Sequence, residues 1–292
     1  MMPASQPSYP QQQLIMSAAP TVCALLGLPA PSGSEGAALQ EVTAEMAPQK
    51  RAAIILLDAL GISTWHSARE RMPSFARLAE GQLLKLRSVL PCSTPVCFAS
   101  IVTGARPEVH GVRQRTDEMK VESVFQVIRR AGKTSAVVGR RSSSTGLLLA
   151  RYSDTAFVAV SNTDQEVEEK LLLAIEQEPA FIFIQLLDID NAGHARGPAS
   201  EESIGACERT DARMSRILSA LSHNGYGAIV MADHGQHTVK EADGAIRGTH
   251  DGSTEEDMLV PLTWQVAAEP GGRRRAPALR GKARRQFMNN RG

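Results

Sequence analysis

The sequence predicts an α/β fold with three layers, α/β/α, around a largely parallel central sheet. Three continuous apolar runs indicate strands: AAIILL at residues 52–57, FIFIQLL at 181–187 and GAIVMA at 227–232. A strand that helices cover on both faces is apolar throughout, whereas a half-exposed strand alternates between apolar and polar residues. Segments with helical periodicity separate the three runs, and this alternation favours parallel pairing.

The other elements follow from their periodicity and their end signals. In the first half of the chain we expect a short helix at 20–28, a loop at 29–36 and a helix at 73–80. In the second half we expect a helix at 121–130 that ends before Gly132, a strand at 134–139, a loop at 140–146, a helix at 164–177, a helix at 200–222 and a last strand at 258–264.

The length and composition are those of one domain with tails. The 292 residues with 42% hydrophobic content are enough for one substantial core. We expect a single catalytic domain over 14–266 and disordered tails over 1–13 and 267–292. The last tail is basic, and such a tail is more often solvated than bound to nucleic acid.

The charge and composition exclude several classes of partner. The net charge is +1 and aromatic residues are only 4%, so we expect no specific nucleic-acid partner. No apolar run approaches the about 18 residues of a membrane helix, and no secretory signal is recognisable. The four cysteines form no CxxC pair and are expected to be reduced thiols. We therefore expect a cytoplasmic protein with no membrane partner, and the oligomeric state stays open.

The stretch LPCSTPVCFASIVTGARPEVHG, residues 90–111, predicts a helix with a hydroxyl at its start. Thr94 is expected at the N-cap, Pro95 at the first helical position and Gly104 at the end. A hydroxyl placed there meets unpaired backbone N–H groups and the positive end of the helix dipole, where a phosphate or an alkoxide is stabilised. Taken alone, the stretch makes Thr94 a helix cap, and the rest of the chain makes it a candidate nucleophile.

Carboxylates follow each of the three apolar runs. Asp58 follows the first, Asp188 and Asp190 follow the second, and Asp233 follows the third. Ligands of parallel sheets bind outside the carboxyl ends of the strands. Carboxylates gathered at one edge repel each other unless cations compensate their charge.

Three histidines accompany these carboxylates. His194 lies four residues after Asp190, across a glycine-containing turn, His234 follows Asp233, and His250 lies between glycines in RGTHDG. Carboxylate and imidazole ligands together suit zinc, with manganese as the alternative. We interpret His110 as the anchor of the turn after the first long helix, and the remaining three as structural: His66, His223 and His237.

The complete set is large enough for two divalent metal ions with open positions for a substrate. Two metals about 4 Å apart are a known arrangement for in-line phosphoryl transfer. The candidate ligands are Asp58, Asp190, Asp233, His194, His234, His250 and the Thr94 hydroxyl.

Five motifs in this order resemble the alkaline phosphatase superfamily, most closely its type I phosphodiesterase/nucleotide pyrophosphatase branch. They are DALG at Asp58, STPVCFASIVTGARPEVHG around Thr94, DNAGHARGP at Asp190, ADHG at Asp233 and GTHDG at His250. The resemblance covers 51–265 and implies an alkaline phosphatase-like fold with two metal ions, usually zinc. It makes Thr94 the nucleophile. It assigns Asp58, Asp233 and His234 to the metal beside the nucleophile, and Asp190, His194 and His250 to the second.

One departure from the family leaves the substrate open. The family carries an Asn that contacts a phosphate oxygen, and here Arg115 falls near that place as a candidate substrate-binding residue. Arg115 and the pair Arg140–Arg141 favour a dianionic phosphomonoester, whereas the motifs favour a phosphodiester or a nucleotide. The prediction is thus a metal-dependent phosphoester hydrolase of the phosphodiesterase type. The alternatives are a phosphomonoesterase of the same superfamily and a metal-stabilised binding protein without turnover.

Overall fold

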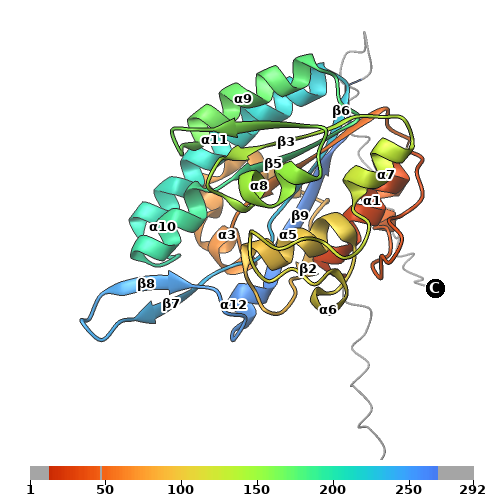
Figure 1. The fold of residues 1–292 in the computed structure, drawn as a ribbon. Coiled ribbons are helices and arrows are strands. Elements are labelled where there is room, and N and C mark those ends of the chain that lie inside the picture. The colour runs from red at the N-terminus through yellow and green to blue at the C-terminus, as the bar shows by residue number, and fades with distance from the viewer. Residues whose placement is uncertain (1–12, 47, 269–292) are drawn as a thin grey trace, which may run out of the picture.

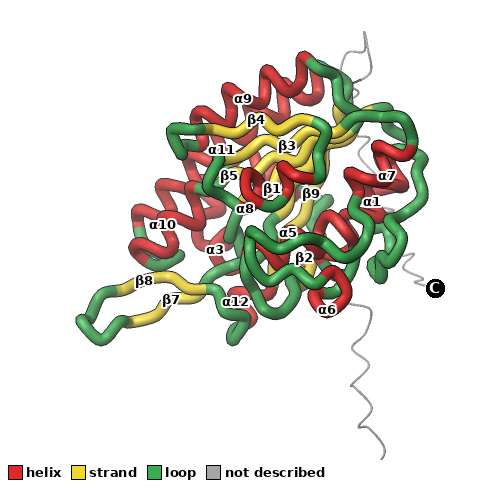
Figure 2. The backbone as a smooth tube through the Cα atoms, viewed as in Figure 1, coloured by secondary structure: helices red, strands yellow, loops and turns green. Residues whose placement is uncertain are grey.

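The computed structural model describes residues 13–46 and 48–268, which form helices on both faces of a central sheet (Figures 1 and 2). The sheet has seven strands in the order β2–β9–β6–β1–β5–β3–β4. Strand β9 pairs antiparallel with β6 and β2, and the other pairs are parallel, which confirms the predicted sheet. The strands are β1 (Arg51–Leu57), β2 (Leu84–Arg87), β3 (Ser135–Arg140), β4 (Thr155–Ala159), β5 (Phe181–Leu186), β6 (Tyr226–Met231) and β9 (Leu259–Gln265).

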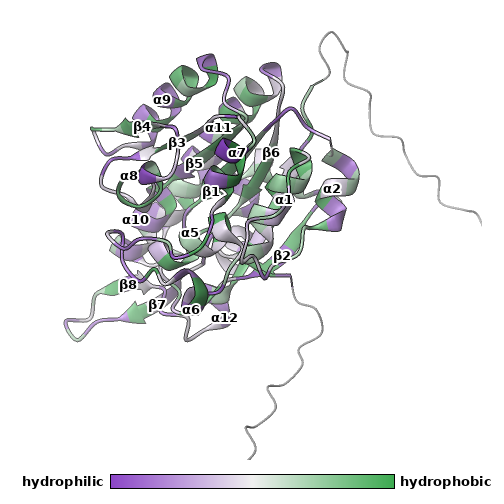
Figure 3. Ribbon diagram, turned by 45° about the vertical axis from the view of Figure 1, so that its right-hand side comes forward, coloured by the Kyte–Doolittle hydropathy of each residue, from purple (hydrophilic) through white to green (hydrophobic). Residues whose placement is uncertain are grey.

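The three predicted apolar runs form adjacent strands, β6, β1 and β5. Every residue of β5 and β6 is buried, as the unbroken apolar pattern requires for strands covered on both faces. Figure 3 shows hydrophobic residues concentrated in this sheet and in the helix faces that pack on it. Because the strands are neighbours and parallel, the residues that follow them leave the sheet side by side at one edge.

Helices cover the two faces of the sheet (Figure 1). One face carries α3 (Ile62–Ala68), α4 (Pro73–Ala79), α9 (Asp164–Glu176) and α11 (Glu201–His223), and the other carries α1 (Ala18–Leu25), α2 (Gln40–Met46), α5 (Thr94–Thr103), α7 (Val124–Arg130) and α8 (Ser144–Leu147). The remaining elements are α6 (Pro107–His110), α10 (Asp188–Arg196), α12 (Glu255–Met258), the hairpin β7 (His237–Lys240)–β8 (Ile246–Thr249), and 3-10 turns at Ile15–Ser17, Arg69–Arg71 and Leu149–Arg151. Among the described residues, no helix has the length and apolarity needed to cross a bilayer.

Several element boundaries differ from the sequence-based expectations. The helix expected at 20–28 spans Ala18–Leu25, and α7 begins at Val124 because Ser123 and Gln126 form a capping box before it. The prediction of a loop over 140–146 is partly wrong, because Arg140 is the last residue of β3 and α8 begins at Ser144. The elements without a predicted helix or strand are short or polar: α2, α3, α6, α8, α10, α12, β2, β4 and the β7–β8 hairpin.

The predicted tails lie outside the described residues except at their inner ends. Gln13 is described, and its carbonyl accepts a 2.9 Å hydrogen bond from the N–H of Arg87. The Gln13 side-chain amide donates to Glu41 at 3.0 Å. At the other end the described chain stops at Ala268.

A buried ion cluster fixes the connection from β5 to α10. The guanidinium of Arg140, 3% exposed, pairs with the fully buried Asp164 at 2.7 Å and also with Asp188. The Asp164 carboxylate also accepts the backbone N–H groups of Leu187 and Asp188, at 2.9 and 2.8 Å. One carboxylate thus holds the first turn of the helix that carries Asp190 and His194.

Replacing Asp164 by Ala tests this cluster. The change leaves Arg140 buried without its full counter-charge, and it removes the acceptor of two N–H groups. We expect the free energy of unfolding to fall by about 3–5 kcal/mol in denaturant titrations. The control is Glu208→Ala, which removes an exposed ion pair to Arg71 and should lower the free energy of unfolding far less. Equal losses in the two variants would contradict this role for Asp164.

Candidate active site

All seven predicted ligands lie at the carboxyl edge of the sheet. Asp58 directly follows β1, Asp233 and His234 follow β6, and Thr94 begins α5. Asp190 and His194 stand on α10, which follows β5, and His250 lies in the loop after β8. They form two clusters, which a pair of imidazole rings connects.

The first cluster surrounds the Nε2 atom of His234. This nitrogen lies 3.3 Å from Thr94 Oγ1, 3.3 Å from Asp233 Oδ2 and 3.6 Å from Asp58 Oδ1. The Nδ1 atom of His234 donates to the carbonyl of Gly235 at 3.1 Å, which leaves Nε2 with a free lone pair. Asp58, Asp233 and His234 are fully buried, and Thr94 is 7% exposed.

Two carboxylate oxygens in this cluster have no hydrogen-bond partner within the described part of the chain: Asp58 Oδ1 and Asp233 Oδ2. Burial, followed by the charges of Asp233 and Asp190, raises the pKa of Asp58 well above its usual range. Burial also raises the pKa of Asp233 to about 8 and lowers that of His234 to about 3. Acidic oxygens that lack donors, beside an imidazole held neutral, fit a divalent cation that would supply the missing positive charge.

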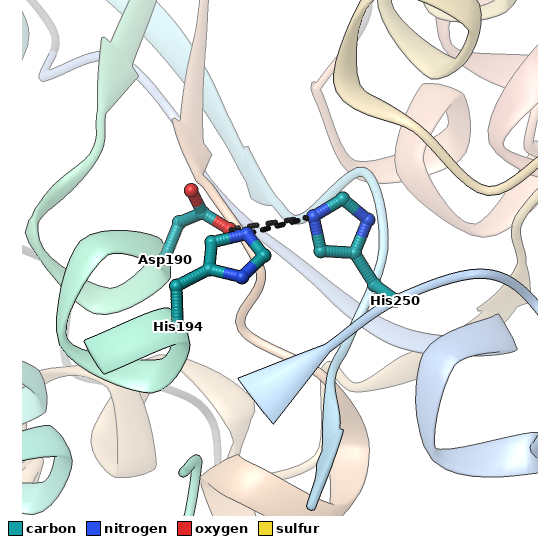
Figure 4. Close-up of side chains that lie close together, drawn as sticks. All are labelled: Asp190, His194 and His250. Carbon is teal, nitrogen blue, oxygen red and sulfur yellow. Dashed lines mark hydrogen bonds and ion pairs between the residues drawn. The ribbon is translucent and has the colours of Figure 1, made fainter. Parts of the chain in front are cut away.

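The second cluster consists of Asp190, His194 and His250, and Figure 4 shows both imidazole rings turned toward the carboxylate. The Nε2 atoms of His194 and His250 lie 3.2 and 3.7 Å from Asp190 Oδ1, and 3.0 Å from each other. Each Nδ1 faces a backbone carbonyl, that of Gly248 at 3.0 Å and that of Cys92 at 2.8 Å. Because both Nδ1–H groups donate to these carbonyls, the two Nε2 atoms are turned toward Asp190 Oδ1 and toward each other, as they would be when they hold one cation.

The rings of His234 and His250 connect the clusters. They stack with centroids 3.8 Å apart and planes 19° apart. The donor atoms of Asp190, His194 and His250 lie close enough to share one ion, and so do those of Asp58, Asp190 and His234, so Asp190 belongs to both sets. Carboxylate and imidazole donors of this kind fit divalent metal ions.

Two local expectations about these residues are wrong. The segment from Asp190 to His194 is not a glycine-containing turn but part of α10, which places the two residues one helical turn apart on one face. Ser93, rather than Thr94, is the N-cap of α5, with extended φ and ψ of −135° and 144°. Thr94 is the first helical residue, and its hydroxyl faces His234 instead of the helix N–H groups.

Two glutamines that carry no predicted role hold the carboxylates in place. The side-chain amide of Gln185 donates to Asp58 Oδ2, and its oxygen accepts the Thr145 hydroxyl at 2.7 Å. The amide of Gln236 donates to Asp190 Oδ1 at 2.8 Å. Gln185 is the one polar residue of an otherwise apolar strand, which was the available signal for it.

The other four histidines lie outside the two clusters. His110 anchors the turn after α5, as expected, since it contacts the Ser100 hydroxyl at 3.0 Å and accepts the Val112 N–H at 3.1 Å. His237, interpreted as structural, pairs with Asp257 at 2.9 Å. His66 and His223 are exposed.

The arginines considered for phosphate binding differ in their availability. Arg115 is exposed, donates to the carbonyl of Ser142 at 3.2 Å, and contributes a charge that lowers the pKa of Asp58 against the larger effect of burial. Arg151 holds this loop by donating to the carbonyl of Arg115 at 3.2 Å. Arg140 is buried in its ion pair with Asp164, so it is not a substrate-binding residue.

Comparison with protein families supports the motif resemblance. A family model described as type I phosphodiesterase/nucleotide pyrophosphatase matches residues 52–290. Ectonucleotide pyrophosphatase/phosphodiesterase family member 1 of Homo sapiens is 25% identical over 178 residues, which are 51% of this chain and 19% of that protein. The venom phosphodiesterase CdcPDE of Crotalus durissus collilineatus is 25% identical over 182 residues, 53% of this chain and 22% of that protein. The chain thus spans about a fifth of the length of these relatives.

Solved structures share the fold. Phosphonoacetate hydrolase from Sinorhizobium meliloti, in complex with phosphonoformate, aligns with a TM-score of 0.53 and 21% identity over 68% of this chain and 59% of that one. An inactive threonine-to-alanine variant of murine ectonucleotide pyrophosphatase/phosphodiesterase 5, in complex with AMP, aligns with a TM-score of 0.57 and 14% identity over 66% of this chain and 59% of that one. At these identities the alignments establish the alkaline phosphatase-like fold alone.

The buried carboxylates predict how the stability of the metal-free protein depends on pH. Folded Asp233 keeps its proton up to a pKa of about 8, whereas the unfolded chain releases it near 3.8. The folded state therefore binds more protons between these values, and its free energy of unfolding should fall as the pH rises from about 6.5 to about 8, by about 1.4 kcal/mol per pH unit for one such group. The opposite effect of His234 is confined to pH below about 6.5.

Denaturant unfolding after EDTA treatment, at pH 6.5 and pH 8, checks this expectation. Excess zinc should remove the loss, because the cation replaces the proton as the partner of the carboxylates. Asp233→Asn should reduce the slope of the metal-free protein. A slope that neither zinc nor Asp233→Asn changes would contradict the assignment.

Proposed function

Because this chain belongs to the type I phosphodiesterase/nucleotide pyrophosphatase family, we propose that it is a metal-dependent phosphoester hydrolase with Thr94 as its nucleophile. The observation that carries the proposal is the 3.3 Å contact between Thr94 Oγ1 and His234 Nε2. It lies inside a donor set in which two carboxylate oxygens have no hydrogen bond from the part of the chain that the structure describes. A hydroxyl in such a position becomes an activated nucleophile when a metal is bound beside it. The inactive threonine-to-alanine variant of the murine structural neighbour is consistent with this role.

Two divalent ions are proposed, zinc by preference and manganese as the alternative. Asp58, Asp233, His234 and the Thr94 oxygen would hold the first, and Asp190, His194 and His250 the second. When bound, the cations lower the pKa of the threonine hydroxyl and offset the negative charge that develops on the phosphoryl oxygens. Mixed carboxylate and imidazole donors favour zinc over the harder calcium and magnesium ions.

The chain's own residues account for the remaining steps. The hydroxyl proton of Thr94 leaves to solvent, and Oγ1 forms a bond to phosphorus as the bond to the leaving oxygen breaks. The leaving oxygen takes the electron pair and then a proton from water. Water next cleaves the phosphothreonine, which releases phosphate from a monoester or a phosphomonoester from a diester and restores the hydroxyl. The N-terminus of α5, which begins at Thr94, would stabilise the negative charge of a phosphoryl group bound to Oγ1.

The substrate class is a small-molecule phosphoester or nucleotide, and the AMP complex of the murine neighbour favours a nucleotide. A phosphomonoester is the second candidate, favoured by the exposed Arg115, whose charge lowers the pKa of Asp58 against the larger effect of burial. A guanidinium binds two oxygens of a dianionic group better than one oxygen of a diester. The cytoplasmic location expected from the sequence stays a prediction.

Replacing Thr94 by Ala tests the nucleophile. We expect hydrolysis of both an aryl phosphate monoester and an aryl phosphate diester to fall by about 1,000-fold or more. The zinc content should stay at the wild-type value, because six other ligands remain. The matched control is Ser93→Ala, which removes the neighbouring hydroxyl and should keep most of the activity.

Two outcomes would contradict this assignment. Wild-type turnover by Thr94→Ala would show that another group attacks phosphorus. A wild-type protein with full zinc occupancy and no turnover of either ester would favour the metal-stabilised binding protein.

Replacing Arg115 by Ala tests the phosphate contact. We expect KM for the monoester to rise about tenfold, since a charge-assisted hydrogen bond is lost, with a smaller change for the diester. Arg113→Ala, at another exposed arginine of the same loop, is the control and should leave both KM values unchanged. Equal KM values in wild type and Arg115→Ala would exclude Arg115 from substrate binding.

A further inference from the structure

Asp257 lies where three ligand-bearing segments meet. It is fully buried in α12. Its backbone carbonyl accepts the N–H of Gly235 at 2.7 Å, next to His234, and the thiol of Cys92 at 3.5 Å. The carbonyl of Cys92 in turn accepts the Nδ1–H of His250.

The Asp257 side chain holds the loop that carries His250. One carboxylate oxygen accepts the N–H of Gly252, two residues after His250, at 2.9 Å. The other accepts Nδ1–H of His237 at 2.9 Å, which connects the start of β7 to the same point. A Cβ on Gly252, whose φ is +85°, would lie 2.2 Å from Leu90 Cδ2, so this loop is also packed tightly against the segment before Thr94.

We propose that Asp257 is a positioning residue for the second metal: it fixes the loop of His250, so that the imidazole meets Asp190 and His194. This inference rests on the proposed two-metal function. The carboxylate accepts a backbone N–H two residues after His250. Near His234 it contacts only the side chain of His237, and the N–H of Gly235 is held by the Asp257 backbone carbonyl. Loss of the side chain therefore weakens the second site and spares the first.

The same residues do not form a third metal site. Asp257, His237 and Asp251 lie close enough to share an ion. However, Asp257 already accepts two donors, and Asp251 is exposed and accepts the N–H of Ser253 at 2.8 Å. The hydrogen bonds within the cluster satisfy these groups. The contacts therefore support a role for Asp257 in fixing the loop of His250 rather than in binding a metal.

Zinc titration of Asp257→Ala tests the proposal. We expect the second zinc to bind about 10–100-fold more weakly, as is typical when a partner behind a ligand is lost, and the first zinc within about threefold of wild type. Asp257→Asn, which keeps an acceptor for the Gly252 N–H, should restore most of the affinity. In the cobalt-substituted protein, the visible absorption of the second site alone should change in Asp257→Ala.

A matched control separates positioning from general stability. Asp211 is also a buried carboxylate and accepts the N–H groups of Ser74 and Phe75 at 3.0 and 2.7 Å, at the start of α4. Asp211→Ala should lower the melting temperature but leave both zinc affinities unchanged. If Asp257→Ala does not fold, His237→Leu, which removes the second donor to the carboxylate, should still weaken the second zinc by about threefold or more.

The proposal is overturned if Asp257→Ala, or His237→Leu in its place, binds both zinc ions as wild type does. It is also overturned if Asp211→Ala weakens the second zinc equally. Because the readout is metal affinity, it is independent of turnover. A wild type without hydrolytic activity, combined with a selective loss in Asp257→Ala, would reject the proposed reaction and keep the positioning role.

Discussion

Three carboxylates at the ends of three adjacent strands impose the constraint on which the rest of the site depends. Asp58 and Asp233 are fully buried, and Asp190 is 9% exposed. The strand order β6–β1–β5 brings them to one edge, where burial and mutual repulsion disfavour the charged forms of Asp58 and Asp233. At Asp190 burial is outweighed by the neighbouring histidines, which lower the pKa. A fold that keeps such groups together needs positive charge at that place, and the two histidine-containing clusters are arranged to receive it.

In Asp58, His194 and His250, a hydrogen bond fixes one polar atom of the side chain and leaves the other polar atom available to bind a metal. Gln185 binds one oxygen of Asp58, and the other, Oδ1, has no hydrogen-bond partner among residues 13–46 and 48–268. The Nδ1 atoms of His194 and His250 face backbone carbonyls, so that their Nε2 atoms converge. Behind these ligands, the Arg140–Asp164 pair fixes the start of α10, and Asp257 fixes the loop of His250. The rigidity of the site is thus built from buried hydrogen bonds that are distant in sequence.

The sequence was sufficient for the central strands and for the place of the candidate ligands at their carboxyl ends, because an unbroken apolar run and the polar residue at its end are local features. It was insufficient where tertiary contacts decide. DNAGHAR has a weak helical pattern, yet it forms α10 because Asp164 holds its first turn. The β7–β8 hairpin is polar and becomes ordered by packing on α10. Arg140 was expected in a loop, and only the fold shows its burial against Asp164. No local sequence pattern indicates that Asp257 positions the loop of His250, because the residues that it contacts there and at Cys92 lie 5 to 165 residues away.

Anomalous diffraction at the zinc edge, from crystals grown with zinc, tests the central claim most directly. The account predicts two peaks at the carboxyl edge of the sheet. One should lie among Asp58, Asp233, His234 and Thr94, and the other among Asp190, His194 and His250. A single peak, or peaks that leave the unpartnered oxygens of Asp58 and Asp233 without a metal, would contradict it.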